Sequence, residues 1–182
     1  GKYTVKFILP DGSSFTIPNT GDDAKDSDAS ANGCSQVVTL NPGDNDITID
    51  AGIVKLASLG DYVWIDSDRD GIQDAGEVGV EGVHVLLYNA QDDKISELVT
   101  DKDGKYLFTG LLPGKYVVAF DAETLPVGYQ ISPDNKGTDD TKDSDGILDI
   151  ESMYAITQVV TLAAEEQNLT LDLGINPIPA KL

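Results

Sequence analysis

The sequence predicts an all-β fold, an antiparallel Greek-key-like β-sandwich that occurs in a tandem repeat. Short apolar segments with strand-like alternation recur along the whole chain. Turns separate them, and the 18 glycines and 8 prolines among 182 residues fit many such turns. No long segment shows the apolar spacing of an amphipathic helix. Many short strands without helices are typical of a sandwich.

The second half of the chain repeats motifs of the first half in the same order. The matching pairs are residues 1–7 with 114–120, 22–28 with 139–145, and 36–40 with 158–162. The spacing between motifs is longer in the second copy, which indicates longer loops. We therefore expect residues 1–57 to be the C-terminal half of one repeat. Residues 58–176 would form a complete repeat, and residues 177–182 a linker to a following repeat.

The half-repeat lacks the first strands of its own sandwich, which would leave sheet edges and a core face open. Either strands from another molecule complete it, or the missing portion lies upstream of this chain. Its own strands are expected from alternation and from the turns at residues 10–12 and 41–44. These expected strands span residues 2–9, 14–17, 35–40 and 46–53, with an acidic loop over 18–33.

The complete repeat is expected to contain eight strands, each bounded by glycine, proline, asparagine or aspartate. They span residues 60–65, 83–88, 95–100, 105–108, 115–121, 129–131, 155–162 and 168–175. Acidic loops follow the first strand and the 129–131 strand. Asp101 and Asp103 fit a tight turn before the 105–108 strand better than a metal site.

Composition excludes several classes of function. The formal net charge is −20, which argues against nucleic acid and against anionic membrane surfaces as partners. No apolar run is long enough to cross a membrane. The acids cluster in loops between apolar strands, which favours metal sites over disorder. The single cysteine, Cys34, excludes a disulfide within the chain.

Residues 66–77 have the spacing of an EF-hand-type calcium loop. Glycine stands at loop position 6, where the chain must turn sharply. The expected Ca²⁺ ligands are Asp66, Asp68, Asp70, the Ile72 carbonyl, Asp74 and Glu77. A strand precedes the loop and a glycine-rich segment follows it, so we expect an EF-type loop in a β scaffold rather than a helix-opening sensor. The alternative is a solvated acidic turn.

A second acidic loop is the next candidate calcium site. Its acids lie one to three residues apart, within reach of one hard cation. They are Asp139, Asp140, Asp143 and Asp145, and their copies in the half-repeat are Asp22, Asp23, Asp26 and Asp28. The recurrence of four acids in an otherwise variable loop favours a metal site, although such clusters are often only solvated.

Catalysis has little support in the sequence, and we expect no enzyme. The only histidine, His84, lies between two valines of a strand and is expected to point away from the core. A lone histidine supports neither a zinc site nor a catalytic triad. Tyr62, Trp64 and Tyr129 could form a sugar-stacking platform or fill a core.

Several motifs in the right order resemble the B-type repeats of serine-aspartate repeat surface adhesins. They are GDYVWIDSDRDGIQD (60–74), GVEGVHVLLY (79–88), TDKDGKYLFTGLLPGKYVVAF (100–120), PVGYQISP (126–133) and DSDG (143–146). Residues 106–116 are also similar to the wider collagen-adhesin B-type, prealbumin-like sandwich group. The resemblance implies a calcium-stabilised sandwich that acts as a stalk between a binding head and a cell-wall anchor.

We therefore expect a calcium-stabilised spacer module of an extracellular bacterial surface protein, either secreted or wall-anchored. Its partners would be neighbouring repeats or copies of itself. Two alternatives remain at this point. One is a module that binds a glycan or a host protein. The other is a subunit of a self-assembling filament, in which a neighbouring molecule completes the half-repeat.

Overall fold

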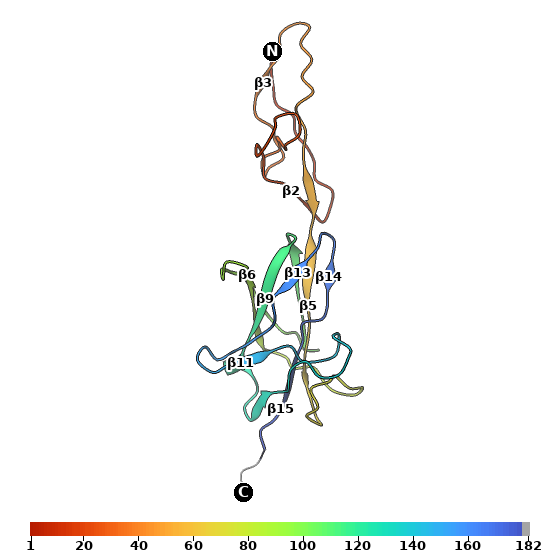
Figure 1. Ribbon diagram of the computed structural model, residues 1–182, viewed down its shortest axis with the longest axis vertical. Coiled ribbons are helices and arrows are strands. Elements are labelled where there is room, and N and C mark those ends of the chain that lie inside the picture. The colour runs from red at the N-terminus through yellow and green to blue at the C-terminus, as the bar shows by residue number, and fades with distance from the viewer. Residues whose placement is uncertain (180–182) are drawn as a thin grey trace. The chain divides into compact units, whose positions relative to one another are not determined.

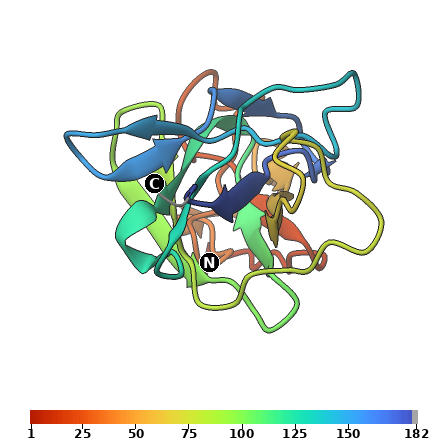
Figure 2. The same ribbon diagram turned by 90° about the horizontal axis from the view of Figure 1, so that it is seen from below.

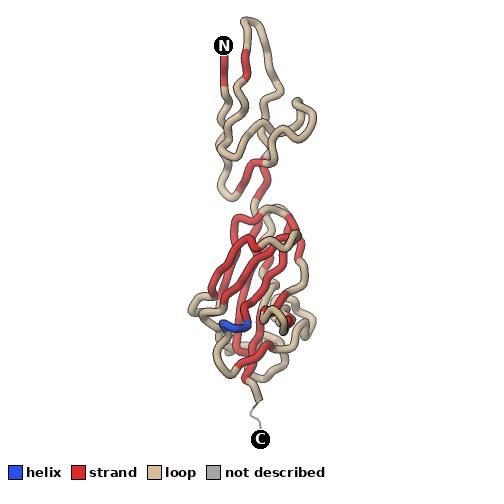
Figure 3. Tube along the Cα trace, turned by 90° about the vertical axis from the view of Figure 1, so that its left-hand side faces the viewer, coloured by secondary structure: helices blue, strands red, loops and turns tan. Residues whose placement is uncertain are grey.

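The computed structural model describes residues 1–179 and divides them into two compact units. Unit 1 is Gly1–Leu56, and unit 2 begins at Ala57. Residues 180–182, the end of the expected linker, lie outside the described part. Unit 2 carries most of the strands, whereas loops make up most of unit 1 (Figure 3).

Unit 2 is a sandwich of two sheets (Figure 1). The central strand of the first sheet is β5. In order, the strands of this sheet are β10 (Tyr129–Ile131), β15 (Leu173–Pro177), β5 (Ala57–Ile65) and β14 (Gln167–Asn168), with β8 (Lys105–Leu111) also paired to β5. The antiparallel pairing of β5 with β8 is the longest in this sheet.

The second sheet has β9 at its centre. Its strands are β11 (Ile147–Asp149), β12 (Tyr154–Ile156), β9 (Gly114–Asp121), β6 (His84–Asn89) and β7 (Lys94–Val99), with β13 (Val160–Leu162) also paired to β9. The 3₁₀ helix η1 (Ala122–Thr124) is the coiled ribbon in Figure 2 and follows β9 directly. The Asp121 side chain caps η1 by accepting a hydrogen bond from the Glu123 backbone N–H.

The predicted all-β sandwich is confirmed, with one departure from a purely antiparallel arrangement. β5 pairs in parallel with β14 and with β15. Parallel neighbours need a long crossover connection. Here the strands of the second sheet, together with β8 and β10, lie between β5 and β14 in the chain.

The core of unit 2 lies between the two sheets. Leu59 and Val63 from β5 pack with Val85 from β6 and Phe120 from β9, and all four are fully buried. The ring of Tyr106 meets the ring of Phe120 edge-on, with centroids 5.6 Å apart. Such edge-to-face contacts add to the free energy gained by burying the rings.

Unit 1 contains four short strands in two pairs. They are β1 (Lys2–Tyr3) with β3 (Val38–Thr39), and β2 (Ser13–Phe15) with β4 (Ile53–Lys55). Each pair has a counterpart in unit 2 with the same register. Tyr3 pairs with Val38 as Tyr116 pairs with Val160. The repeated motifs therefore adopt the same local structure in both units.

Some expected strand boundaries are wrong. The alternating segment 46–53 is not a strand until Ile53. Its counterparts in unit 2 pair with β5, and the described residues of unit 1 contain no strand equivalent to β5. The expected strand 155–162 is split into β12 and β13, because Thr157 departs from the ladder to bond the Val118 backbone. β11 lies inside the segment expected to be an acidic loop.

Candidate metal centre

The first acidic loop starts where β5 ends and folds around Asp66. This residue is fully buried, and its backbone N–H donates to the Ile175 carbonyl at 2.8 Å. Its carboxylate accepts the backbone N–H of Arg69 at 2.7 Å and that of Gly71 at 3.1 Å. One carboxylate therefore fixes both the loop entrance and the turn that the sequence predicts at position 6.

Glu77 reaches back to the start of the same loop. Its Oε1 accepts the Ser67 N–H at 2.6 Å, and its Oε2 accepts the Asp74 N–H at 2.9 Å. Both oxygens are thus held by backbone donors. Asp70 also accepts a backbone N–H, that of Ile72, at 2.8 Å. These bonds hold the carboxylates of Glu77 and Asp70 against the backbone of the loop.

Three of the six expected ligands of this loop lie together. One oxygen from each of Asp66, Asp68 and Asp70 can be chosen so that all three lie within 4.8 Å of one another. Asp66 is buried and the other two are exposed, so the triad opens to solvent on one side. Ile72, Asp74 and Glu77 lie in the loop but are not part of this triad.

The second acidic loop brings together Asp140, Asp143 and Asp145, again with one oxygen from each within 4.8 Å of the others. The structure does not group Asp139 with them. Its carboxylate instead accepts the Thr141 hydroxyl at 2.7 Å. These hydrogen bonds to Thr141 lower the pKa of Asp139, because they stabilise the charged form.

Asp143 has the surroundings that best suit a bound cation. It is buried, and its Oδ1 atom has no hydrogen-bond partner among the described residues. Burial raises the pKa of Asp143, and burial raises the pKa of Asp145 to about 7. A bare cluster of this kind is unfavourable, because acids at close range repel each other and lose hydration. A cation bound by these oxygens would relieve both penalties, and an all-oxygen donor set suits a hard cation.

The two loops, expected as separate sites, are joined to each other. The Gln73 N–H donates to the Lys142 carbonyl at 2.6 Å, and the Ser144 N–H donates to the Gly71 carbonyl at 3.2 Å. A β-bridge between Ile72 and Asp143 lies between these bonds. Figures 1 and 2 both show the yellow and teal loops side by side at one end of unit 2.

Gly71 makes this junction possible. Its φ angle is +80°, and a Cβ atom there would lie 2.3 Å from the Pro133 carbonyl oxygen. The sequence indicates the turn at this glycine but not its close approach to the second loop. Gly137 makes a milder contact, since a Cβ there would lie 3.2 Å from the Ile72 side chain.

Sequence reasoning missed Asp172, a buried acid behind the second triad. Its N–H donates to Asp145 Oδ2 at 2.8 Å, and its Oδ1 accepts the Tyr62 N–H at 3.0 Å. Burial, and next the charge of Asp61, raise the pKa of Asp172 to about 9. A signal was available, because Asp50 stands at the equivalent place in the repeated pattern ITID and LTLD.

Unit 1 does not gather its four expected ligands in the same way. Among residues 1–179, the triads with metal-ligand spacing are the two in unit 2. Asp22 and Asp26 accept backbone N–H groups within their own loop, and Asp23 is exposed. Asp28 is buried, and its Oδ2 accepts the Asp50 N–H at 2.9 Å. This last bond matches the bond between Asp145 and Asp172.

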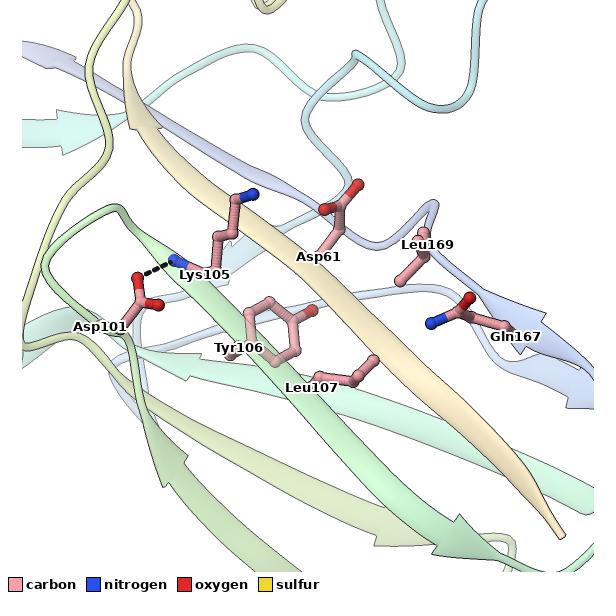
Figure 4. Close-up of a pocket in the computed structure, with 7 residues that line it drawn as sticks. All are labelled: Asp61, Asp101, Lys105, Tyr106, Leu107, Gln167 and Leu169. Atoms are coloured by element: carbon pink, nitrogen blue, oxygen red, sulfur yellow. Dashed lines mark hydrogen bonds between the residues drawn. The ribbon is translucent and has the colours of Figure 1, made fainter. Parts of the chain in front are cut away.

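A pocket of about 300 Å³ lies on the first sheet of unit 2, between β8 and β14 (Figure 4). Asp101 and Asp61 line it. The Asp101 carboxylate accepts the Lys105 N–H at 2.9 Å, as its expected turn role requires. Burial raises the pKa of Asp61. The Tyr106 hydroxyl donates to the Leu171 carbonyl and is not free for a ligand.

The aromatic platform considered for sugar stacking does not form. Trp64 is fully buried, and the Tyr62 ring stacks on it at a centroid distance of 6.4 Å. His84 is half-buried, and its Nδ1 lies 2.8 Å from Glu97 on the surface of the second sheet. In the part of the chain that the structure describes, no helix is long and apolar enough to span a membrane.

Two units with matching strand pairs, acid-rich loops and a sandwich core define a tandem-repeat β-sandwich protein with two candidate cation loops. The chain belongs to the family of SdrD B-like domains, whose model matches residues 1–53 and 57–175. This result confirms the resemblance to the B-type repeats of serine-aspartate repeat proteins.

The comparisons also identify individual relatives. The chain is 39% identical over 181 residues to serine-aspartate repeat-containing protein F of Staphylococcus epidermidis, covering 96% of this chain and 10% of that protein. It is 38% identical over 177 residues to serine-aspartate repeat-containing protein D of Staphylococcus aureus strain Newman, covering 96% of this chain and 12% of that protein. The chain thus spans about a tenth of the length of these curated relatives.

Solved structures of other bacterial proteins also align with the chain. The minor pilin GBS52 of Streptococcus agalactiae aligns with a TM-score of 0.44 and 16% identity, over 85% of this chain and 68% of that chain. The Bacillus anthracis TIE protein aligns with a TM-score of 0.46 and 14% identity, over 98% of this chain and 25% of that chain.

Proposed function

We propose that this chain is a calcium-stabilised structural spacer of an extracellular bacterial surface protein. The observation that carries the proposal is the junction of two acidic loops in unit 2, with buried Asp66 on one side and the unpartnered Asp143 oxygen on the other. Membership in the family of SdrD B-like domains, and similarity to serine-aspartate repeat-containing proteins, support a surface location and a structural role.

The mechanism follows from linkage between binding and folding. The two triads exist only in the folded chain, so Ca²⁺ binds the folded state and stabilises it. At 100 times the dissociation constant, one such site adds about 2.7 kcal/mol to the free energy of unfolding. Extracellular calcium modules bind with dissociation constants of about 10⁻⁴–10⁻³ M, which suits a calcium-rich exterior.

The residues proposed to hold Ca²⁺ are those of the two loops of unit 2. Asp66, Asp68 and Asp70 would bind the first ion, and the Ile72 carbonyl, Asp74 and Glu77 would complete its shell. Asp140, Asp143 and Asp145 would bind the second, with Asp139 at its edge. For Asp22, Asp23, Asp26 and Asp28 of unit 1 we keep calcium as a weaker proposal.

Calcium titration with native mass spectrometry and thermal unfolding tests the proposal. We expect bound Ca²⁺ on the folded chain, a higher melting temperature with Ca²⁺ than with chelator, and faster proteolysis after chelation. Magnesium serves as the control, because it demands smaller, octahedral sites and should stabilise less. Equal melting temperatures with Ca²⁺ and with chelator would remove calcium from the proposal.

The open face of unit 1 supports assembly as a second candidate function. Tyr3 and Ile53 are exposed, whereas their counterparts in unit 2, Tyr116 and Ile175, are buried in the core. Apolar strands from a neighbouring molecule would cover these side chains and yield a filament. Analytical ultracentrifugation over a range of protein concentrations tests this candidate, and a monomer at every concentration would exclude it.

A further inference from the structure

The outer face of the second sheet carries an apolar row where solvent-facing residues are expected to be polar. Residues directly opposite on neighbouring strands share a face, and the strand pairings of the second sheet define the row. Ile147 of β11 pairs with Ile156 of β12, which pairs with Ala119 of β9, which pairs with Leu86 of β6. The row therefore crosses four strands on the face away from the core, where Ile147 and Ile156 are exposed and Ala119 and Leu86 are buried.

A groove of about 360 Å³ lies over two residues of this row, Ala119 and Ile156. Tyr88 and Tyr154 line it together with the aliphatic side chains of Val117, Ala119 and Ile156. Exposed apolar residues continue along the hairpin between β11 and β12. They include Ile147, Ile150 and Met153. Exposed apolar side chains that gather at a groove favour an interaction site.

The polar part of the groove is acidic. Asp92 and Asp149 line it. The Asp149 carboxylate accepts the Ser152 hydroxyl at 2.7 Å and the Glu151 N–H at 3.1 Å. These bonds lower the pKa of Asp149, so its charge persists well below neutral pH. The neighbouring cation Lys94 does not neutralise the groove, because it already pairs with Glu97 at 3.2 Å.

We propose that this groove binds an extended cationic peptide. An apolar or aromatic side chain of the peptide would fill the groove over Ala119 and Ile156, between the two tyrosines. Flanking lysine or arginine residues would reach Asp92 and Asp149. The site is independent of the cation loops, since none of its lining residues belongs to either triad.

The chemistry of the groove favours a peptide over the other occupants. The Ser152 hydroxyl is bonded to Asp149, which leaves it unavailable to a sugar. A second copy of this chain brings its own net charge of −20 and would be repelled by the acids of the groove. A cationic segment is attracted by the same charges and buries the apolar row.

The test uses the 182-residue chain and two fluorescently labelled peptides. One alternates arginine with leucine around a central phenylalanine, and the other has glutamate in place of each arginine. We expect anisotropy to report binding of the arginine peptide and none of the glutamate peptide. Binding should weaken as ionic strength rises, since exposed charges are screened. Tyr154→Ala should weaken it at least tenfold, because buried tyrosines dominate such contacts.

Two charge variants keep the test informative if Tyr154→Ala unfolds. The double variant Asp92→Asn with Asp149→Asn should weaken binding about four- to twenty-fold, as expected for the loss of two exposed charge pairs. Asp46→Asn is the matched control, because Asp46 likewise accepts a backbone N–H and a hydroxyl, both from Thr48, but lies in unit 1. It should leave binding unchanged.

Three outcomes would overturn the proposal. The first is equal binding of both peptides, which would show that charge plays no part. The second is equal loss of binding in Asp46→Asn and in the double variant, which would indicate a general effect of net charge. The third is binding of an oligosaccharide panel in the groove with no binding of the arginine peptide at low ionic strength.

Discussion

Asp66 stabilises the conformation of its loop even when no ion is bound. Two backbone N–H groups, of Arg69 and Gly71, donate to its buried carboxylate. Asp70, in the same triad, is exposed and makes one local hydrogen bond. The two acids therefore differ in what they contribute to folding, although both are proposed to bind the same ion.

Substitution of these two acids separates the structural role from the ion-binding role. Asp66→Ala should lower the free energy of unfolding by about 1–3 kcal/mol even in chelator, because buried donors lose their acceptor. In chelator, Asp70→Asn should have nearly the same free energy of unfolding as the unaltered chain. In Ca²⁺, it should have a lower free energy of unfolding than the unaltered chain. Urea unfolding with and without Ca²⁺ measures both effects. Equal behaviour of the two variants in chelator would contradict this assignment.

Two buried acids at the second triad, Asp145 and Asp172, predict an unusual pH dependence. Burial raises the pKa of Asp145 to about 7 and that of Asp172 to about 9. A carboxyl group with a raised pKa holds more protons in the folded state than in the unfolded state. Its contribution to the free energy of unfolding is therefore largest at low pH and falls as the pH rises toward the folded pKa.

We accordingly expect the melting temperature in chelator to fall between about pH 5 and about pH 8. Excess Ca²⁺ should reduce the fall, because it favours the ionised form of Asp145. Asp172→Asn should flatten the profile in chelator, since it removes the group with the higher raised pKa. Thermal unfolding followed by circular dichroism checks all three conditions. A melting temperature that rises with pH in chelator would show that these acids are ionised when folded.

The elements that hold the site are two loops joined by a short β-bridge rather than one loop on its own. The sequence predicts both loops from the spacing of their acids, and it predicts the sharp turn from the glycine at position 71. It does not predict that Gln73 and Lys142 bond to each other, because contacts between distant loops depend on how the sheets place the loop ends. Asp172 was missed for the same reason, since its role comes from its position next to Asp145.

Gly71 and Gly76 test the importance of this junction. Both have positive φ angles, +80° and +101°, but only Gly71 has a backbone atom in the way of a Cβ. Gly76→Ala should lower the free energy of unfolding by about 1 kcal/mol, the cost of the left-handed conformation. Gly71→Ala should lower it by about 3 kcal/mol and weaken calcium binding, because the two loops must move apart. Equal losses would mean that the junction contributes little.

Strand prediction succeeded where alternation coincided with a partner strand and failed where the partner was absent. The 129–131 strand matches β10, and the 115–121 strand differs from β9 by one residue. Residues 46–52 alternate equally well, yet without an equivalent of β5 they form no ladder. β11 was missed because its apolar residues, Ile147 and Leu148, lie within an acid-rich segment. The many acids of that segment predict a loop, and two apolar residues are too few to indicate a strand.

At the scale of the whole molecule, the motif of residues 1–7 in unit 1 and its copy at 114–120 in unit 2 have different surroundings. Val5 and Val118 occupy equivalent places in the two units. Val5 is hydrogen-bonded to Ser35, and Val118 is hydrogen-bonded in the same way to Thr157, the counterpart of Ser35. Val118 is fully buried in the core, whereas Val5 is 39% exposed. The local fold is therefore encoded by the motif itself, but the packing energy depends on the strands that cover it.

This pair predicts that the two units differ strongly in stability. Val118→Ala should lower the free energy of unfolding of unit 2 by about 2 kcal/mol, because it leaves a cavity in a packed core. Val5→Ala should change stability by less than about 0.5 kcal/mol, as for other exposed sites. Hydrogen exchange followed by mass spectrometry resolves the units separately, and amides of unit 1 should exchange faster than their counterparts in unit 2. Equal losses of stability in the two variants would mean that the face around Val5 is covered in solution, as it would be in an assembly of this chain. Ultracentrifugation of the same sample would then show an oligomer.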